Sequence, residues 1–412
     1  MFDDNRLKIQ ELYLCGMQPL RQTFLRYNAQ TSDAPLLLEF SRAEGVFLYD
    51  SQGKQYLDLI SGIGVSNVGH GHPRVVAAVR EQAGRFMHLM VYGEFVQAPQ
   101  VRYAEKLAGL LPEKLSCVYF TNSGAESVEG ALKLAKRSTG RNEIIACRNS
   151  YHGSTQGALS VMGNEEYKQA YRPLLPGIQF IRFNRHKDLS LIRPETACVI
   201  LETIQGEAGI RVPEKEYLKA LRARCHETGT LLILDEIQTG MGRTGSLFAF
   251  EQYGIEPDIL LTAKALGGGM PLGAFIASPA IMQHLSYDPP LGHITTFGGH
   301  PVCCAAGLAA LEVLLEEDLA AKANEKGGLF RKLLQHPSIR EFRGAGLLMA
   351  LEFESFEQNK AVIDRCIEKG VITDWFLHDS RSMRLAPPLT IREEQIRDAC
   401  SVILESIEEV IN

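Results

Sequence analysis

Short apolar runs alternate with amphipathic stretches through the middle of this 412-residue chain. The runs are apolar at consecutive positions, which is typical of strands buried between two layers of helices. They lie at residues 117–120, 143–148, 178–183, 197–202, 231–235, 258–262 and 272–276. Apolar positions with a helical period fall between or after them, at about 101–111, 124–138, 214–228 and 301–316. The pattern predicts an α/β fold with a mainly parallel, seven-stranded sheet between helices, whose ligands bind beyond the carboxyl ends of the strands.

The two ends of the chain show a different pattern. Short strand-like runs separated by Gly or charged turns occur at 36–40, 45–50 and 54–59, and the last part of the chain alternates helix and strand before an amphipathic helix from about 392. We therefore expect a smaller α+β domain built from both chain ends. The predicted divisions are 1–60 for its N-terminal part, 61–310 for the large domain and 311–412 for its C-terminal part.

Composition and charge narrow the class of protein. Hydrophobic residues make up 45% and charged residues 22%, as in globular chains with a continuous core. A net charge of −6 gives no basic field for nucleic acid, and no run of about eighteen apolar residues predicts a membrane span. The first residues do not resemble a signal peptide, and nine cysteines, several inside apolar runs, favour a reducing cytoplasm. No second ligand pair completes a zinc site around Cys303 and Cys304, so no metal is predicted.

A cluster of small and hydroxyl residues, TNSGAE at 121–126, joins one predicted strand to the helix that follows it. Backbone N–H groups at a helix N-terminus attract anions such as phosphate. An ordinary Asn or Ser helix cap would explain the same residues. The cluster is therefore a candidate anion site with a plain structural alternative.

Two charged side chains follow neighbouring apolar runs. Asp235 ends the run LLILD, and Lys264 follows the run DILLT among small residues and just before three glycines. A Mg²⁺ site of the Walker type would explain the acid, but the glycine-rich loop that such a site needs is missing. A crowded, desolvated lysine suits imine chemistry. Lysine, acid and helix N-terminus together are what pyridoxal phosphate needs for its Schiff base, its pyridinium nitrogen and its phosphate.

Eight motifs, in order over about residues 35–400, resemble those of the class III aminotransferases, nearest the ornithine and acetylornithine branch. They are SGIGVSNVGHGHPRV, TNSGAESVEGALKLAKR, YHGST, ETIQGEAGI, DEIQTGMGRTG, LTAKALGGGMPLGA, TTFGGHP and RLAPPLTI. The resemblance implies fold type I, a pyridoxal phosphate cofactor and a homodimer with shared active sites. It also implies that an ornithine-like, acetylornithine-like, diamine or omega-amino acid donor passes its amino group to a 2-oxo acid such as 2-oxoglutarate. A racemase, aminomutase or decarboxylase of the same fold is the alternative.

The resemblance assigns cofactor contacts to eight residues. Lys264 would form the imine and move the proton, Asp235 would bind the pyridine nitrogen, and Gln238 the phenolic oxygen. Tyr151 would stack on the ring, and Thr296 would reach the phosphate from the neighbouring subunit. The phosphate would otherwise be held by Ser123, Gly124 and Ala125.

Four further residues concern the substrate. By the same resemblance, Arg384 would bind a substrate carboxylate, and Glu207 would neutralise this arginine when a substrate has no carboxylate there. Ser154 stands where the related enzymes usually carry a second carboxylate-binding arginine, and Asp33 stands where an aromatic residue is common. These departures suggest a donor with a second cation or without the distal carboxylate, as in a diamine. Asp33 could equally be a plain turn residue in TSDAP.

Overall fold

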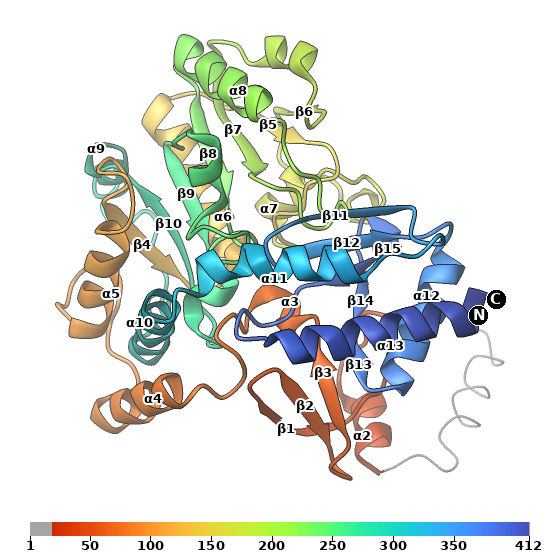
Figure 1. Ribbon diagram of the computed structural model, residues 1–412. Helices are drawn as coiled ribbons and strands as arrows, with labels where there is room; N and C mark the ends of the chain where they lie inside the picture. The colour runs from red at the N-terminus through yellow and green to blue at the C-terminus, as the bar shows by residue number, and fades with distance from the viewer. Residues whose placement is uncertain (1–18, 412) are drawn as a thin grey trace, which may run out of the picture.

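The computed structural model describes residues 19–411 of the chain (Figure 1). The opening segment that bears on targeting therefore lies largely outside the described residues. The helices of the described part are α2 (Pro19–Tyr27), α3 (Ser61–Gly64), α4 (Pro73–Arg85), α5 (Ala98–Ala108), α6 (Gly124–Thr139), α7 (Gln156–Val161), α8 (Lys215–Thr228), α9 (Pro279–Met282), α10 (Pro301–Glu316), α11 (Leu319–Leu333), α12 (Phe356–Glu368) and α13 (Glu393–Ile411). None of these helices is both long and apolar enough to cross a membrane.

The central sheet has seven strands in the order β4-β10-β9-β8-β7-β5-β6. Their bounds are β4 (Cys117–Thr121), β5 (Glu143–Cys147), β6 (Ile178–Ile181), β7 (Thr196–Glu202), β8 (Leu231–Asp235), β9 (Ile259–Thr262) and β10 (Gly273–Ala277). Neighbours from β9 to β6 are parallel, and only β10 runs antiparallel to its two neighbours. The predicted mainly parallel sheet is confirmed.

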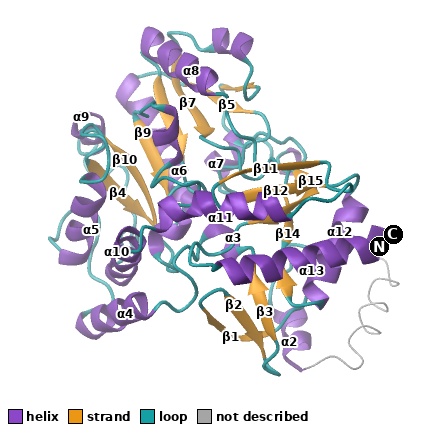
Figure 2. Ribbon diagram, viewed as in Figure 1, coloured by secondary structure: helices purple, strands orange, loops and turns teal. Residues whose placement is uncertain are grey.

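Alternate side chains of the central strands enter two different cores. On one face, residues such as Ile200 and Ile233 pack with α6 and α7, whereas Leu201 and Leu234 on the other face pack with α8 and α5. Helices accordingly cover both faces of the sheet (Figure 2). Burial on both faces explains why these strands are apolar at every position rather than at every second one.

Two four-stranded sheets accompany the central one. The first, β1-β2-β3-β13, pairs β1 (Phe40–Glu44), β2 (Phe47–Asp50) and β3 (Gln55–Asp58) with β13 (Val371–Ile372) from the other end of the chain. The second, β11-β12-β15-β14, is formed by β11 (Glu341–Ala345), β12 (Leu348–Glu352), β15 (Asp379–Leu385) and β14 (Asp374–Phe376). Both chain ends therefore build the smaller α+β part, as predicted, while the exact divisions at 60 and 310 stay predictions.

One local prediction is wrong. The run at 36–40 was expected to be a strand, but pairing begins only at Phe40. Leu37 has a φ of 53°, in the left-handed region that an extended strand cannot include. The apolar residues of this run instead line a groove beside α2.

Candidate active site

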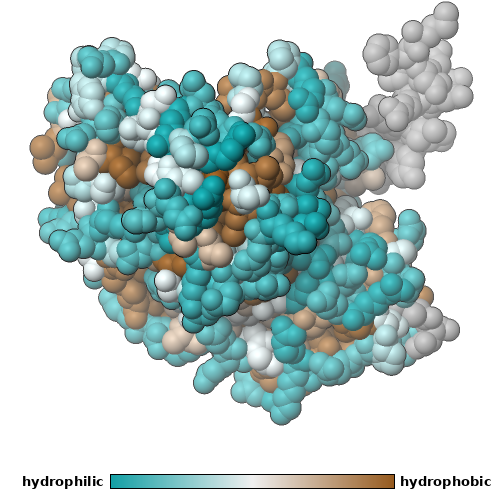
Figure 3. Space-filling view, turned by 90° about the horizontal axis from the view of Figure 1, so that it is seen from above, coloured by the Kyte–Doolittle hydropathy of each residue, from teal (hydrophilic) through white to brown (hydrophobic). Residues whose placement is uncertain are grey.

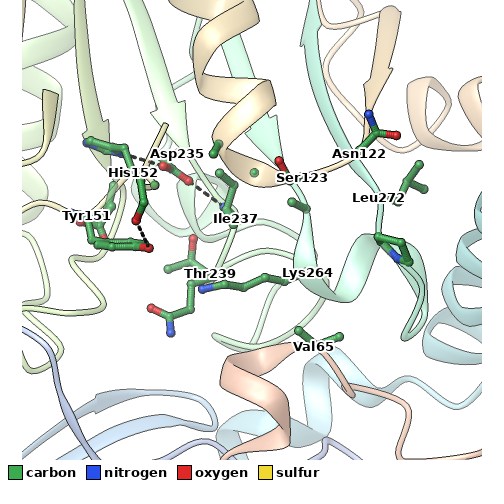
Figure 4. Close-up of a pocket in the computed structure, with 18 of the residues that line it drawn as sticks. Val65, Asn122, Ser123, Tyr151, His152, Asp235, Ile237, Thr239, Lys264 and Leu272 are labelled. Atoms are coloured by element: carbon green, nitrogen blue, oxygen red, sulfur yellow. Dashed lines mark hydrogen bonds and ion pairs between the residues drawn. The ribbon is translucent and has the colours of Figure 1, made fainter. Parts of the chain in front are cut away.

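A cavity of about 750 Å³ opens at the carboxyl ends of the central strands. Its lining comes from the start of α6, from the loops after β5, β7 and β8, and from the segment after β9 (Figure 4). This is the edge of a parallel sheet at which ligands are expected. Of the residues singled out from the sequence, nine line this cavity: Ser123, Gly124, Ala125, Tyr151, Ser154, Glu207, Asp235, Gln238 and Lys264.

Asp235 ends β8 and is 4% exposed. One carboxylate oxygen accepts a hydrogen bond from Nδ1 of His152 at 2.7 Å, and the other accepts from the backbone N–H of Ile237 at 3.0 Å. Both bonds are drawn in Figure 4. Because a buried carboxyl group is stable only with such partners, these two bonds satisfy both oxygens of Asp235 at the floor of the cavity. His152 belongs to the motif YHGST, but its role was not predicted from the sequence.

Lys264 follows β9 and begins the short 3-10 helix η4 (Lys264–Gly267). Its φ is 50°, a left-handed conformation that is uncommon for a residue with a side chain. Burial lowers the pKa of its ammonium group below the ordinary 10.5, although the nearby Glu207 carboxylate acts in the opposite direction. The result is a half-buried amine that loses its proton more readily than a surface lysine.

The start of α6 forms one end of the cavity. The Ser123 hydroxyl caps the helix by accepting from the backbone N–H of Glu126 at 3.2 Å. A Cβ on Gly124 would lie 2.9 Å from the Ile237 side chain, and a Cβ on Gly153 would lie 2.7 Å from that of Ala125. The two glycines therefore let the backbone pack closely around this helix N-terminus, where an anion is favoured.

Gln238 follows β8 and has a buried side-chain Nε2 with no hydrogen-bond partner among the described residues. A Cβ on Gly206 would lie only 1.7 Å from its Oε1, so glycine is needed for the amide to fit. A buried donor without a partner costs stability unless a ligand or water satisfies it. The Gln238 amide thus points to an acceptor atom in the cavity.

Arg384 and Glu207 form a buried, two-pronged ion pair. Arg384 Nη1 donates to Oε1 of Glu207 at 2.9 Å and Nη2 donates to Oε2 at 3.0 Å. The Leu377 backbone N–H adds a hydrogen bond to Oε2 at 3.0 Å. Although burial alone raises the pKa of Glu207, the Arg384 charge lowers it to about 2. Glu207 lines the cavity, whereas Arg384 is 2% exposed and does not.

Glu202 is a second buried carboxyl that sequence reasoning missed. It ends β7 directly opposite Asp235 in the strand pairing, and it accepts from the backbone N–H groups of Tyr151 at 3.0 Å and Gly206 at 2.7 Å. Burial raises its pKa to about 7, with His152 lowering it and Asp235 raising it. Its place as the last residue of an apolar run, like that of Asp235, was the signal that could have revealed it.

Comparison with known families explains this arrangement. The family model for aminotransferase class-III matches residues 27–407. The chain belongs to the class III aminotransferases. An acetylornithine aminotransferase from Methanosarcina mazei is 41% identical over 385 residues, covering 90% of this chain and 91% of the relative. A putrescine aminotransferase from Pectobacterium atrosepticum is 40% identical over 432 residues, covering 99% of this chain and 90% of the relative.

Solved structures agree with this assignment of the class III aminotransferase fold. An ornithine aminotransferase from Toxoplasma gondii superposes with a TM-score of 0.87 at 32% identity, covering 100% of this chain and 99% of that one. An omega-transaminase from Thermomicrobium roseum gives a TM-score of 0.86 at 30% identity and full coverage of both chains. The predictions of family, fold and aminotransferase activity are confirmed.

The cofactor of this class III aminotransferase is pyridoxal phosphate, and the cavity fits it. A helix N-terminus for the phosphate, a buried carboxylate on Asp235, an amine on Lys264 and an unpartnered amide donor on Gln238 face one space. When bound, the cofactor supplies a ring that withdraws electrons from the reacting carbon of the substrate.

Besides Arg384, two of the residues assigned by resemblance lie outside the cavity lining of the described chain. Thr296 is exposed, and its backbone carbonyl accepts from Nε2 of His88 at 2.7 Å. Asp33 is also exposed and does not line the cavity. Their roles stay predictions. Within residues 19–411, no group of three or more potential metal ligands gathers anywhere.

Proposed function

We propose that this aminotransferase takes the terminal amino group of a diamine, or of a related donor without a distal carboxylate, and passes it to a 2-oxo acid. The observation that carries the proposal is the neutral hydroxyl of Ser154 in the cavity lining. Within the described part of the chain, this hydroxyl lies 3.4 Å from the Tyr151 hydroxyl, its hydrogen-bond partner. A distal carboxylate would find no guanidinium there, whereas a distal ammonium or alkyl group meets no repulsion.

The charges around the cavity do not oppose a cationic donor. Three acids line it, namely Glu202, Glu207 and Asp235, but Arg384 neutralises Glu207 and burial raises the pKa of Glu202 to about 7, so only part of their charge stands against that of Lys264. Arg384 adds no exposed positive charge while Glu207 is paired with it. The similarity to a putrescine aminotransferase over 99% of the chain points to the same kind of donor.

The proposed acceptor is 2-oxoglutarate or a similar 2-oxo dicarboxylate. Arg384 binds its carboxylate with both Nη atoms after Glu207 moves away, because guanidinium and carboxylate match in geometry. In the donor half of the reaction, Glu207 stays on Arg384 and keeps the buried charge paired. The ion pair between Arg384 and Glu207 thus opens for the acceptor, which has a carboxylate, and stays closed for the donor, which has none.

The remaining residues handle the cofactor and the proton. Lys264 would hold the cofactor through its amine, and once the amino group of the donor has displaced it there, the freed neutral amine would take the proton from the donor carbon, a task for which a lowered pKa is suited. Asp235, oriented by His152, would hold the proton on the ring nitrogen. Gln238 would donate to the phenolic oxygen, Tyr151 would stack on the ring, and the Ser123–Ala125 segment would bind the phosphate.

We further propose a cytoplasmic homodimer in which Thr296 reaches the phosphate of the partner's site. Thr296 is exposed beside Phe297, which is itself 54% exposed, and Met87 and Phe95 are 66% and 56% exposed. Hydrophobic residues are visible between polar ones on one face of the molecule in Figure 3. An apolar patch favours burial against a partner, and we propose that the surface carrying these residues is the one buried in the dimer. All eight cysteines of the described part are free thiols, which fits a reducing compartment.

A donor panel with 2-oxoglutarate as acceptor tests the proposal. Purified enzyme is offered putrescine, ornithine, acetylornithine and 4-aminobutyrate, and glutamate formation is measured. We expect putrescine to give the highest kcat/KM. A strong preference for acetylornithine would remove the diamine proposal and leave the aminotransferase assignment intact.

Two variants of Ser154 sharpen this test. Ser154→Arg should raise kcat/KM for acetylornithine relative to putrescine by about tenfold or more, because it adds a charge-assisted carboxylate contact. The matched control, Ser154→Ala, removes the hydroxyl without adding charge and should keep the original order of donors. An unchanged order in Ser154→Arg would contradict the role given to this position.

A further inference from the structure

The three residues of β14 all contact the Arg384 side chain. The Asp374 carboxylate accepts from Arg384 Nε at 2.9 Å, and the Trp375 carbonyl accepts from Nη2 at 3.3 Å. The Phe376 ring lies under the guanidinium, with 4.6 Å between the guanidinium carbon and the ring centroid. Asp374 and Arg384 are also direct partners in the pairing of β14 with β15. These contacts with the Arg384 side chain therefore all come from the strand that pairs with its own strand, β15.

Glu207 holds the same arginine from the opposite structural part. It comes from the loop after β7 of the central sheet and occupies both Nη atoms. Because Glu207 lines the cavity and Arg384 does not, a carboxylate in the cavity reaches the Nη edge only after Glu207 has moved. The contacts from Asp374, Trp375 and Phe376 do not involve Glu207, so they survive this exchange.

We infer that Asp374 is a positioning residue for the acceptor half of the reaction, holding the Arg384 guanidinium in place while Glu207 gives way to the substrate carboxylate. The inference rests on the proposed role of Arg384 as the carboxylate-binding residue. In the absence of Asp374, once Glu207 has moved, the Arg384 guanidinium would keep only the 3.3 Å hydrogen bond to the Trp375 carbonyl and the contact with the face of the Phe376 ring. A long side chain with so few contacts samples several rotamers, and fixing it again on binding costs affinity.

The negative charge of Asp374 does not oppose this role. It repels the Glu207 carboxylate and an incoming substrate carboxylate alike, because both occupy the same edge of the guanidinium. The repulsion therefore largely cancels from the exchange, and the orientation of Arg384 remains as the main effect. Burial raises the pKa of Asp374 to about 6, with Arg384 lowering it and Glu207 raising it, so measurements at pH 8 keep the carboxylate ionised.

The test is the binding of glutarate to the holoenzyme at pH 8. Glutarate is a dicarboxylate without an amino or oxo group, so it occupies the carboxylate site without reacting. Trp375, the single tryptophan of the 412-residue chain, contacts Arg384 through its backbone carbonyl while its indole packs on Phe356, so its fluorescence follows the exchange indirectly. Calorimetry provides a second measure of the dissociation constant.

We expect Asp374→Ala to weaken glutarate binding by at least about tenfold, since a charge-assisted contact that orients the arginine is lost. Asp374→Asn keeps an oxygen that can accept from Nε and should stay within about threefold of the unchanged enzyme. The donor half-reaction with putrescine alone, followed by cofactor absorbance, should change by less than about twofold in both variants, since Glu207 then holds Arg384. If Asp374→Ala folds poorly, the variant Asp374→Ser is used in its place, because the side chain of serine is one atom shorter than that of aspartate.

Asp364→Asn is the charge control, because it removes a partly exposed acid of α12 whose ion pair among residues 19–411 is with Lys360. It should leave both measurements unchanged. Equal losses in glutarate binding and in the donor half-reaction, or no loss in either, would overturn the positioning role. Failure of the unchanged enzyme to bind glutarate would instead overturn the proposed acceptor site itself, and the inference with it.

Discussion

The cofactor-binding half of the cavity and its carboxylate-binding half are built in different ways. Asp235 ends β8, Lys264 follows the adjacent strand β9, and α6 begins after β4 of the same sheet. Arg384 lies in β15 and Glu207 in the loop after β7, and their side chains meet in an ion pair, beside backbone N–H groups of Leu377 and His378 that also bond Glu207. The first half is held by the backbone of a single rigid layer, the second by side chains across two structural parts.

The difference matches what each half has to do. A cofactor stays bound through many cycles, so its contacts gain from fixed strand ends and from buried hydrogen bonds such as that between His152 and Asp235. Two substrates must alternate at the other half, so its contact is an ion pair in which one carboxylate can replace another. Fixed and exchangeable contacts lie side by side in one cavity.

The largest effect is expected in the fixed half, for Lys264→Ala. This variant should lose turnover by at least about a thousandfold, because it removes both the covalent attachment and the proton carrier. The absorbance band of the lysine-bound cofactor should disappear as well. Normal transamination by Lys264→Ala would contradict the assignment of the whole site.

Asp235→Asn should slow amino transfer by about two to three orders of magnitude while the cofactor still binds. The amide keeps the shape of the side chain but no longer stabilises a proton on the ring nitrogen, and its bond with His152 loses its charge. Rapid-mixing measurement of each half-reaction checks this. Both halves should slow together, and wild-type rates in either one would count against the proposed role.

The fixed half was largely predictable from the sequence, for a physical reason. The runs that became β8 and β9 are apolar at every position because both faces are buried, so their ends could be located. A charged residue at such an end stands out. Asp235 and Lys264 were found in this way, and the motifs of the family then supplied Gln238 and Tyr151.

The exchangeable half was only partly predictable. Arg384 and Glu207 came from resemblance, but Asp374 carried no signal, because its contact depends on which residue of β15 it faces. Register between strands is a tertiary property that a short run such as Asp374–Phe376 does not encode by itself. Glu202 could be found at the end of its apolar run, but its bonds with two backbone N–H groups depend on how the loops after β5 and β7 fold.

Glu207→Gln tests the exchangeable half, and its expected effect is smaller than that of Lys264→Ala or Asp235→Asn. The glutamine cannot match the ion pair with Arg384, so a carboxylate should displace it more easily and KM for 2-oxoglutarate should fall by a few-fold, about threefold to tenfold. The donor half-reaction should slow by about tenfold, because Arg384 is then incompletely neutralised. Opposite changes in the two half-reactions are the signature to measure. Equal slowing of both would show that Glu207 serves the fold rather than the exchange.

The smallest effect concerns the pH dependence of stability. Burial raises the pKa of Glu202 and of Glu236 from the usual 4.5 to about 7. Between these values the folded protein holds protons that the unfolded chain has released, so the free energy of unfolding falls as pH rises from 4.5 to 7 and then levels off. The pKa of Glu207, lowered to about 2, has the opposite effect, since its stabilisation is lost only as pH falls from 4.5 towards 2.

Three isosteric variants therefore distinguish these buried carboxyl groups by how steeply Tm changes with pH. Glu236 lies outside the cavity lining and is bound by the Thr203 and Thr239 hydroxyls and two backbone N–H groups, so Glu236→Gln tests the fold without touching the cofactor. Its Tm should change by about 3 °C less between pH 5 and 7 than that of the unchanged enzyme. Glu202→Gln should reduce the pH dependence of Tm in the same way. The groups that face Glu202 are Asp235, His152, Lys264 and Cys147. Glu207→Gln should keep the original slope, because Arg384 holds Glu207 ionised throughout this range; a flattened slope there would mean that Glu207 does not rest on Arg384 when no substrate is bound.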